Sequence, residues 1–167
     1  MRGELRLFPR YVHSPEQLTR WRAQITQTFQ AYLKQRRLRA TAPRQAVVEF
    51  LMNARNHVGV DDIYGALRRQ RGIGRATVFR TLKLLEACGL ASRVSGKDAA
   101  GRYELKYERP HHDHLICVEC GTIIEFQSPE MERYQNEAVK RRGFQMLWHR
   151  HEIFGRCRAC PHDDTLR

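Results

Sequence analysis

The sequence predicts an α+β protein in two parts, a helical part that ends in one short hairpin and a smaller part that mixes strands with one helix. Three observations support this prediction. Apolar residues recur at helical spacing up to about residue 88, and basic side chains are concentrated in the same stretch. Residues of metal-ligand type are concentrated after residue 110, where two C-x-x-C pairs also lie. Each part is therefore expected to form its own small domain.

The chain has 167 residues and carries 30 Lys and Arg against 18 Asp and Glu. Residues 1–110 hold 22 basic and 9 acidic side chains, net +13, whereas residues 111–167 hold 8 and 9, net −1. The first part thus has the electrostatic footprint of a polyanion binder, most simply of a nucleic-acid binder. A basic surface that is merely solvated and has no partner is the alternative.

Four helices are expected in the first part, at residues 15–35, 41–52, 60–69 and 75–88. In the first, apolar residues recur at spacings of three and four, as on one face of an amphipathic helix. The second is expected to begin at Thr41, with a capping hydroxyl and a proline in the first turn. The third carries acidic residues in its first turn, where the helix dipole favours negative charge.

The fourth helix has two distinct faces. The expected buried stripe is Val78, Leu82 and Leu85. Another face is basic with one aromatic ring, and comprises Arg75, Phe79, Arg80 and Lys83. In a helix that enters DNA, such a face supplies phosphate contacts, hydrogen bonds to base edges and an apolar surface for a thymine methyl group. The alternative is a solvated face whose phenylalanine packs against a neighbouring element.

A strand pair is expected after the fourth helix. Residues 90–94 and 102–106 form the two predicted strands, and residues 96–101 form the turn between them. Helices followed by a basic hairpin make a winged helix-turn-helix domain, in which one helix enters the major groove and the hairpin rests against the duplex. We place this domain at residues 15–109, and expect residues 1–14 to be a frayed tail.

Residues 110–167 are expected to form a small α/β domain that follows the Arg109-Pro110 boundary. Strands are predicted at residues 115–118, 122–126 and 144–154, and a helix at residues 129–142. The strands of such a unit are available for pairing with a second copy of the chain.

Four cysteines are spaced as ligands of a structural metal ion. They form two C-x-x-C pairs, Cys117 with Cys120 and Cys157 with Cys160. Two residues between thiols allow one turn to present both sulfurs to one Zn²⁺ ion, and four thiolates close its tetrahedral shell. The alternative is two unrelated thiol pairs. Cys88 lies in an apolar helix and is expected to pack in the core.

The imidazoles and the carboxylate of residues 111–114 are too many for the same ion. We therefore expect at least one further metal site, built from nitrogen and oxygen ligands.

Other classes of protein are disfavoured by features that the sequence lacks. No apolar run approaches the about 20 residues of a membrane span, and no signal-peptide core is present, so a cytoplasmic protein without a membrane partner is expected. A zinc enzyme is one alternative, but H-E-x-x-H is absent, and Pro161 follows the cysteine pair that it would precede in a zinc deaminase. A redox protein acting through C-x-x-C is the other alternative, and it predicts a reversible dithiol titration without bound zinc.

Several motifs of the chain occur together in one known family. They are Thr41-Ala42-Pro43-Arg44, the segment from Asn56-His57 to Asp61-Asp62-Ile63-Tyr64, Ala76-Thr77-Val78-Phe79-Arg80, the run from His111 to Cys117, Ile124-Glu125-Phe126 and the terminal cysteines. Over roughly residues 30–160, the chain resembles the ferric uptake regulator family of bacterial metal-sensing repressors. The resemblance implies a homodimer that binds double-stranded, palindromic DNA operators, without enzymatic activity or a small-molecule substrate. It also implies an N-terminal winged helix and a C-terminal α/β dimerisation domain in each subunit.

The resemblance further implies roles for individual residues. The structural zinc falls on Cys117, Cys120, Cys157 and Cys160. The regulatory metal falls on His57, Glu104, His112, His114 and Glu125, so that one ion takes ligands from both domains. An additional metal in many members falls on His111, Asp113, Glu132 and His149. DNA contacts fall on Arg39, Arg44, Arg75, Thr77, Phe79, Arg80 and Lys83.

Two of these implied sites have simpler alternatives. A lone histidine at a helix start, such as His57, is more often satisfied or solvated than a ligand, and the additional set could be ordinary surface histidines and carboxylates. His112 and His114 point to one side of a strand, which fits shared coordination, whereas His111 and Asp113 alternate onto the opposite side.

We choose Fe²⁺ as the expected regulatory ion, with Mn²⁺ and Zn²⁺ as alternatives. Three His and two Glu suit all three ions, and the order of affinities does not reveal which one the cell supplies. The lack of a thiol argues mildly against a zinc sensor, and Glu125 stands where peroxide-sensing members tend to carry Asp. The chain departs from the family at Phe79, where members usually carry Tyr, and in a longer extension before residue 30.

Overall fold

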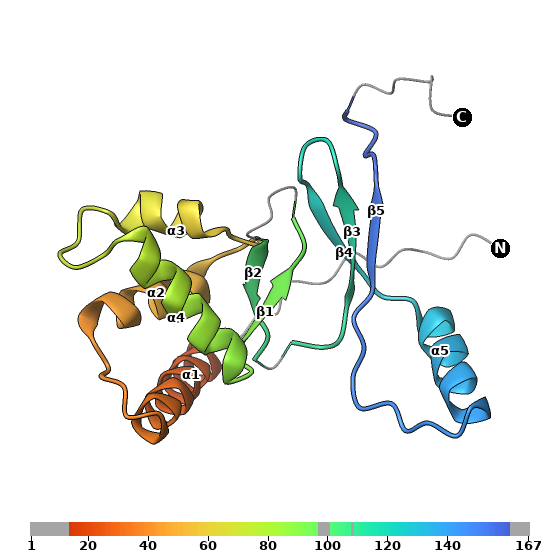
Figure 1. The fold of residues 1–167 in the computed structure, drawn as a ribbon, viewed down its shortest axis with the longest axis horizontal. Helices are drawn as coiled ribbons and strands as arrows, with labels where there is room; N and C mark the ends of the chain where they lie inside the picture. The colour runs from red at the N-terminus through yellow and green to blue at the C-terminus, as the bar shows by residue number, and fades with distance from the viewer. Residues whose placement is uncertain (1–13, 97–100, 108, 161–167) are drawn as a thin grey trace. The chain divides into compact units, whose positions relative to one another are not determined.

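A computed structural model describes residues 14–96, 101–107 and 109–160. The predicted tail at residues 1–14 and the turn at residues 96–101 therefore lie largely outside the described residues. The chain divides into two compact units, the first ending at Arg109 and the second beginning at Pro110. The α+β fold class expected from the sequence is confirmed, with four helices and a hairpin in the described part of the first unit, and one helix and three strands in that of the second (Figure 1).

The helices of the first unit are α1 (Pro15–Gln35), α2 (Ala42–Asn53), α3 (Val60–Leu67) and α4 (Arg75–Ala87). A reciprocal capping box starts α1, in which the Ser14 hydroxyl accepts from the Gln17 N–H and the Gln17 side chain accepts from the Ser14 N–H. The expectation that the Thr41 hydroxyl caps α2 is wrong, because Thr41 holds the N-cap position without a side-chain hydrogen bond. One reason is Pro43, which has no N–H to donate at the second helical position.

One apolar core joins all four helices of the first unit to its hairpin. Each helix contributes fully buried side chains, among them Ile25 and Phe29 of α1, Val47 of α2, Ile63 of α3 and Leu82 of α4. Burial of one such side chain stabilises the fold by about 1.5–3 kcal/mol. Cys88 packs at the edge of this core, as the sequence predicts.

The hairpin pairs β1 (Ala91–Val94) with β2 (Arg102–Leu105) in antiparallel register. A Cβ at Gly101, where φ is +69°, would lie 2.6 Å from the Arg93 side chain and 2.9 Å from the Val94 carbonyl, so the turn back into β2 requires glycine. The segment before α3 adds a further bridge to β2, in which Val58 and Tyr103 exchange backbone hydrogen bonds of 2.9 and 2.8 Å. This bridge brings His57, the residue before Val58, beside Glu104, the residue after Tyr103.

The second unit is built on a three-stranded sheet of order β4-β3-β5, with β3 (Asp113–Cys117) in the centre. β4 (Ile123–Phe126) pairs with β3 antiparallel, and β5 (Glu152–Gly155) pairs with it parallel. Helix α5 (Pro129–Arg141) lies between β4 and β5 in the chain (Figure 1), and none of its residues is buried. The sheet therefore holds the ordered core of this unit.

The predicted strand at residues 144–154 is wrong over most of its length. Only Glu152–Gly155 forms a strand, and the His151 carbonyl before it accepts from the His114 N–H of β3, whereas residues 144–150 have no strand partner in the described part of the chain. Three large apolar side chains in this stretch are exposed, Phe144 by 74%, Leu147 by 82% and Trp148 by 78%. The physical reason is that β3 is only five residues long and offers no further backbone groups for pairing.

Candidate metal sites and nucleic-acid interface

The four cysteines of the two C-x-x-C pairs lie together at one end of the sheet. Cys117 ends β3, Cys120 follows in a tight turn, and the chain after β5 supplies Cys157 and Cys160. The sulfur–sulfur distances are 3.7 Å from Cys117 to Cys160, 3.6 Å from Cys120 to Cys157 and 3.5 Å from Cys157 to Cys160. A tetrahedron with Zn–S bonds of about 2.3 Å has edges of about 3.8 Å, so this donor set fits a zinc ion.

The electrostatics of the cluster favour a cation as well. Backbone N–H groups of Cys120 and Cys157 lower the pKa of the Cys117 thiol to about 6, the latter donating over 3.3 Å. Hydrogen bonds to the neighbouring sulfurs of Cys157 and Cys120 raise the pKa of Cys160 to about 12. Four adjacent thiolates repel one another, so a divalent cation is needed to keep all four ionised.

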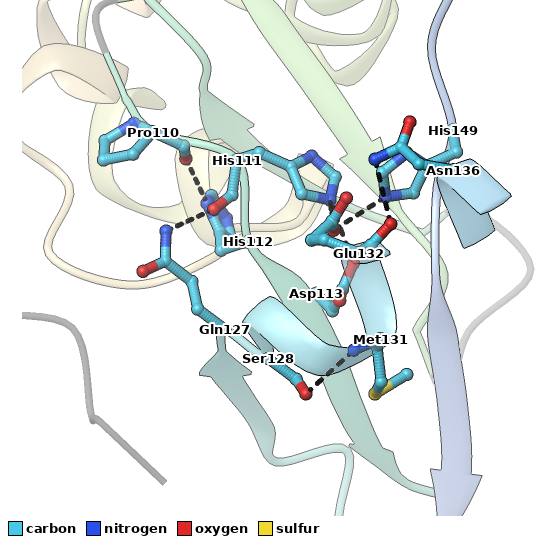
Figure 2. Close-up of polar contacts among 10 residues, drawn as sticks. All are labelled: Pro110, His111, His112, Asp113, Gln127, Ser128, Met131, Glu132, Asn136 and His149. Atoms are coloured by element: carbon cyan, nitrogen blue, oxygen red, sulfur yellow. Dashed lines mark hydrogen bonds and ion pairs between the residues drawn. The ribbon is translucent and has the colours of Figure 1, made fainter. Parts of the chain in front are cut away.

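A second set of ligand types lies where β3 begins, beside the first turn of α5 (Figure 2). The Nε2 atom of His111 lies 3.1 Å from Asp113 Oδ1 and 3.2 Å from Glu132 Oε1, and His149 Nε2 lies 3.1 Å from the same Glu132 oxygen. Asp113 is 1% exposed, and its Oδ2 atom has no hydrogen-bond partner in the described part of the chain. A buried carboxylate oxygen without a partner is costly, so the four residues fit a bound cation.

The first unit contributes a buried pair to the predicted regulatory set. His57 lies directly before α3 and Glu104 lies in β2, and the Val58–Tyr103 bridge brings the two side by side. His57 Nε2 is 3.6 Å from Glu104 Oε2, and both side chains are 6% exposed. Arg109 also pairs with Glu104 Oε2, a contact that the sequence analysis did not predict.

The second unit gathers the other three residues of that set around β3. The rings of His112 and His114 lie 4.9 Å apart, centroid to centroid, and Glu125 stands directly opposite His114 in the β3–β4 register. His112 Nδ1 lies 3.0 Å from the Pro110 carbonyl, which only accepts hydrogen bonds (Figure 2). A hydrogen on Nδ1 satisfies this contact, and Nε2 is then the ring nitrogen through which a metal would bind. Each unit thus holds its own part of the predicted ligand set.

The predicted DNA-contacting face of α4 is exposed. Val78, Leu82 and Leu85 are fully buried, while Phe79 is 46% exposed and Arg80 projects from the same open face. An open groove of about 450 Å³ is lined by four of the predicted DNA contacts together with small neighbours, namely Arg39, Arg44, Thr77 and Arg80 with Thr41, Pro43 and Gly72. A basic groove beside a helix face of this kind fits a phosphate backbone.

Two predicted DNA contacts on α4 already have acidic partners. Arg75 Nε lies 2.5 Å from an oxygen of Asp61 in α3, and Lys83 Nζ lies 2.5 Å from Glu86. The sequence pattern explains Asp61 as a favourable charge in the first turn of its helix and as part of a family motif, but not as a partner of Arg75. No local pattern joins it to Arg75, because the two residues are fourteen positions apart and meet only when α3 packs against α4.

Comparison with known proteins explains why these features occur together. The family model described as "Ferric uptake regulator family" matches residues 35–154. The chain belongs to the ferric uptake regulator family. The ferric uptake regulation protein of Campylobacter jejuni is 34% identical over 139 residues, which cover 81% of this chain and 88% of that protein.

Solved structures of family members agree with this assignment. The Helicobacter pylori ferric uptake regulator, described as having three functional metal binding sites, has a TM-score of 0.75 and 30% identity, covering 86% of this chain and 96% of its own. The Francisella tularensis regulator with iron has a TM-score of 0.66 and 34% identity, covering 74% and 94%. As a member, the chain is a metal-responsive transcriptional regulator and not an enzyme. Among the described residues, no helix combines the length and apolarity that crossing a membrane requires.

Proposed function

We propose that this regulator is a homodimeric, cytoplasmic repressor that binds a palindromic DNA operator when a divalent cation occupies its regulatory site. Fe²⁺ is the proposed ion, and Mn²⁺ and Zn²⁺ are the alternatives. The similarity to a regulator solved with iron and the shell of nitrogen and oxygen ligands support Fe²⁺.

One observation carries the proposal, the buried pair of His57 and Glu104 in the winged-helix unit. Both side chains are 6% exposed, and in the described part of this unit the other buried polar side chain is Thr81. A buried imidazole and a carboxylate that face each other offer a nitrogen and an oxygen ligand to a further partner, which at Glu104 would replace Arg109. We propose that this partner is a metal ion that also takes His112, His114 and Glu125 from the second unit.

The mechanism follows from holding ligands on two units. Without the ion, the winged helices of a dimer sample many orientations, and few of them match two half-sites about one helical turn apart. An ion bound by both units restricts the orientation of the winged helix. The entropy lost in fixing that orientation is then a cost of metal binding and no longer a cost of DNA binding. A coupling of about 1–3 kcal/mol is typical and changes operator affinity about 5- to 150-fold.

Two further ions are proposed for the second unit. Zn²⁺ on Cys117, Cys120, Cys157 and Cys160 would stabilise the fold, because four thiolates leave no position for water or substrate. An additional divalent cation is proposed on His111, Asp113, Glu132 and His149, and the buried Asp113 oxygen without a partner supports it. Three donor sets agree in number with the sites named for the Helicobacter pylori regulator.

A second copy of the chain is the proposed partner of the exposed apolar stretch at residues 144–149. Phe144, Leu147 and Trp148 are at least 74% exposed and, with α5 residues such as Val139, border a cavity of about 650 Å³. Exposed apolar patches of this kind mark protein interfaces, and unpaired backbone is available for pairing between copies.

Operator binding should be measured by gel shift and fluorescence anisotropy at one salt concentration, with Fe²⁺, Mn²⁺ or Zn²⁺ and with chelator. The wild-type protein is expected to bind more tightly with its regulatory ion, whereas Glu104→Gln should bind equally in metal and chelator. Glu49→Gln is the matched control, because it removes an exposed carboxylate from the same unit. Equal wild-type affinity in metal and chelator would contradict the proposal.

A further inference from the structure

The first residue of α4 is held in place by two residues of α3. Arg75 Nε donates to Asp61 Oδ1 over 2.5 Å, and the Arg75 guanidinium lies over the Tyr64 ring, 4.7 Å from its centroid. The hydrogen bond fixes the direction of the side chain, and the ring supports it from one side. Arg75 is therefore more restricted than an ordinary exposed arginine.

Stability does not explain this arrangement. The side chains of Arg75 and Asp61 are 65% and 76% exposed. Ion pairs with that exposure contribute little to folding, because water screens them and two long side chains lose freedom. The contact with Asp61 therefore affects folding little, but it holds the Arg75 guanidinium in one direction and so affects what Arg75 binds.

The contact with Asp61 leaves one end of the guanidinium available. Asp61 occupies Nε, and no acceptor is recorded for the two Nη groups in the described part of the chain. These two groups form a fork that matches O6 and N7 of guanine in the major groove, the commonest base-specific contact of arginine. Recognition helices contact base edges with their N-terminal residues, and Arg75 is the first residue of α4.

We propose that Arg75 reads one guanine in each operator half-site, with Asp61 and Tyr64 as its positioning residues. This inference rests on the proposed operator binding through α4. Arg75 does not line the basic groove that Arg39, Arg44 and Arg80 border. The Asp61 carboxylate adds specificity in a second way, because it repels phosphate and so disfavours complexes in which Arg75 lacks its guanine.

The test begins with selection of an operator from random duplex DNA by the metal-loaded wild-type protein. Each base pair of the selected site is then replaced, and affinities are compared for the wild type, Arg75→Lys, Asp61→Asn and Lys83→Gln. For the wild type, loss of the guanine in one half-site should weaken binding by about 5- to 150-fold. Arg75→Lys keeps the charge and the salt dependence but should lose this preference, because an ammonium group has no fork.

The other two variants separate positioning from charge. Asp61→Asn should weaken the guanine preference while tightening binding to unrelated DNA, a pair of opposite changes that a merely structural role does not produce. Lys83→Gln is the matched control from the same helix face, and should weaken all sequences equally while lowering the salt slope by about 1 per subunit.

The outcomes distinguish this inference from the function on which it rests. If the metal-loaded wild type selects no sequence, operator binding is refuted and the role of Arg75 with it. If the wild type selects an operator and Arg75→Lys keeps every base preference, only the reading by Arg75 is overturned. If Asp61→Asn keeps the full guanine preference, the positioning role of Asp61 is overturned.

Discussion

Removal of the proposed zinc ion is expected to unfold the second unit while the first unit stays folded. Apart from cysteines, the buried apolar side chains in the described part of the second unit are Ile116 and Phe126. Their burial contributes about 3–6 kcal/mol together. A structural Zn²⁺ ion contributes about 10–16 kcal/mol at neutral pH, so the ion is the larger contribution.

The first unit has no such dependence. Among the described residues, its core joins four helices and the hairpin through fifteen buried apolar side chains, and none of the four clustered cysteines belongs to it. Loss of zinc should therefore leave α1 to α4 helical. The two units should respond separately to the same treatment.

Limited proteolysis with mass spectrometry measures both responses in one experiment. With Cys160→Ser, or after zinc extraction under reducing conditions, cleavage should spread through residues 110–160 while a fragment ending near Arg109 persists. Cys88→Ala is the matched control, because it removes a thiol outside the cluster. Protection of residues 110–160 in zinc-free protein would refute this reasoning.

Three further predictions concern the hairpin and its neighbours. Burial raises the pKa of Tyr103, whose hydroxyl has no partner in the described part of the chain, so Tyr103→Phe should raise the free energy of unfolding by about 1 kcal/mol in urea titrations; a loss would contradict this. Gly101→Ala should lower the free energy of unfolding by about 1–3 kcal/mol, because φ is positive there and a Cβ would make close contacts. Gly65→Ala is the control, because Gly65 has open space in α3, and it should not lower the free energy of unfolding. Arg109→Ala removes a cation from Glu104 and should raise affinity for the regulatory ion by about tenfold in a metal titration; unchanged affinity would show that Arg109 does not compete.

Elements with a strong local pattern could be predicted from the sequence. The buried stripe of α4 follows from a period of 3.6, and Leu82 and Leu85 are fully buried as expected. The proximity of Cys117 and Cys160 follows from two C-x-x-C pairs, because such spacing suits one ion.

Features that depend on packing between distant segments could not be predicted in this way. The stretch before β5 has apolar residues at strand-like spacing, yet pairing needs a neighbouring strand, and Trp148 has none in the described part of the chain. The contact of Arg75 with Asp61 arises only when α3 meets α4. The role of His57 follows only from the family resemblance, since a single histidine before a helix carries no signal of its own.

The most direct test of metal-controlled operator binding is a metal titration of the zinc-loaded dimer, with and without operator DNA. Because the coupling is reciprocal, operator DNA should tighten binding of the regulatory ion by the same factor, about 5- to 150-fold, by which that ion tightens operator binding. An affinity for the ion that operator DNA leaves unchanged would contradict the idea that one cation, shared between the two units, controls DNA binding.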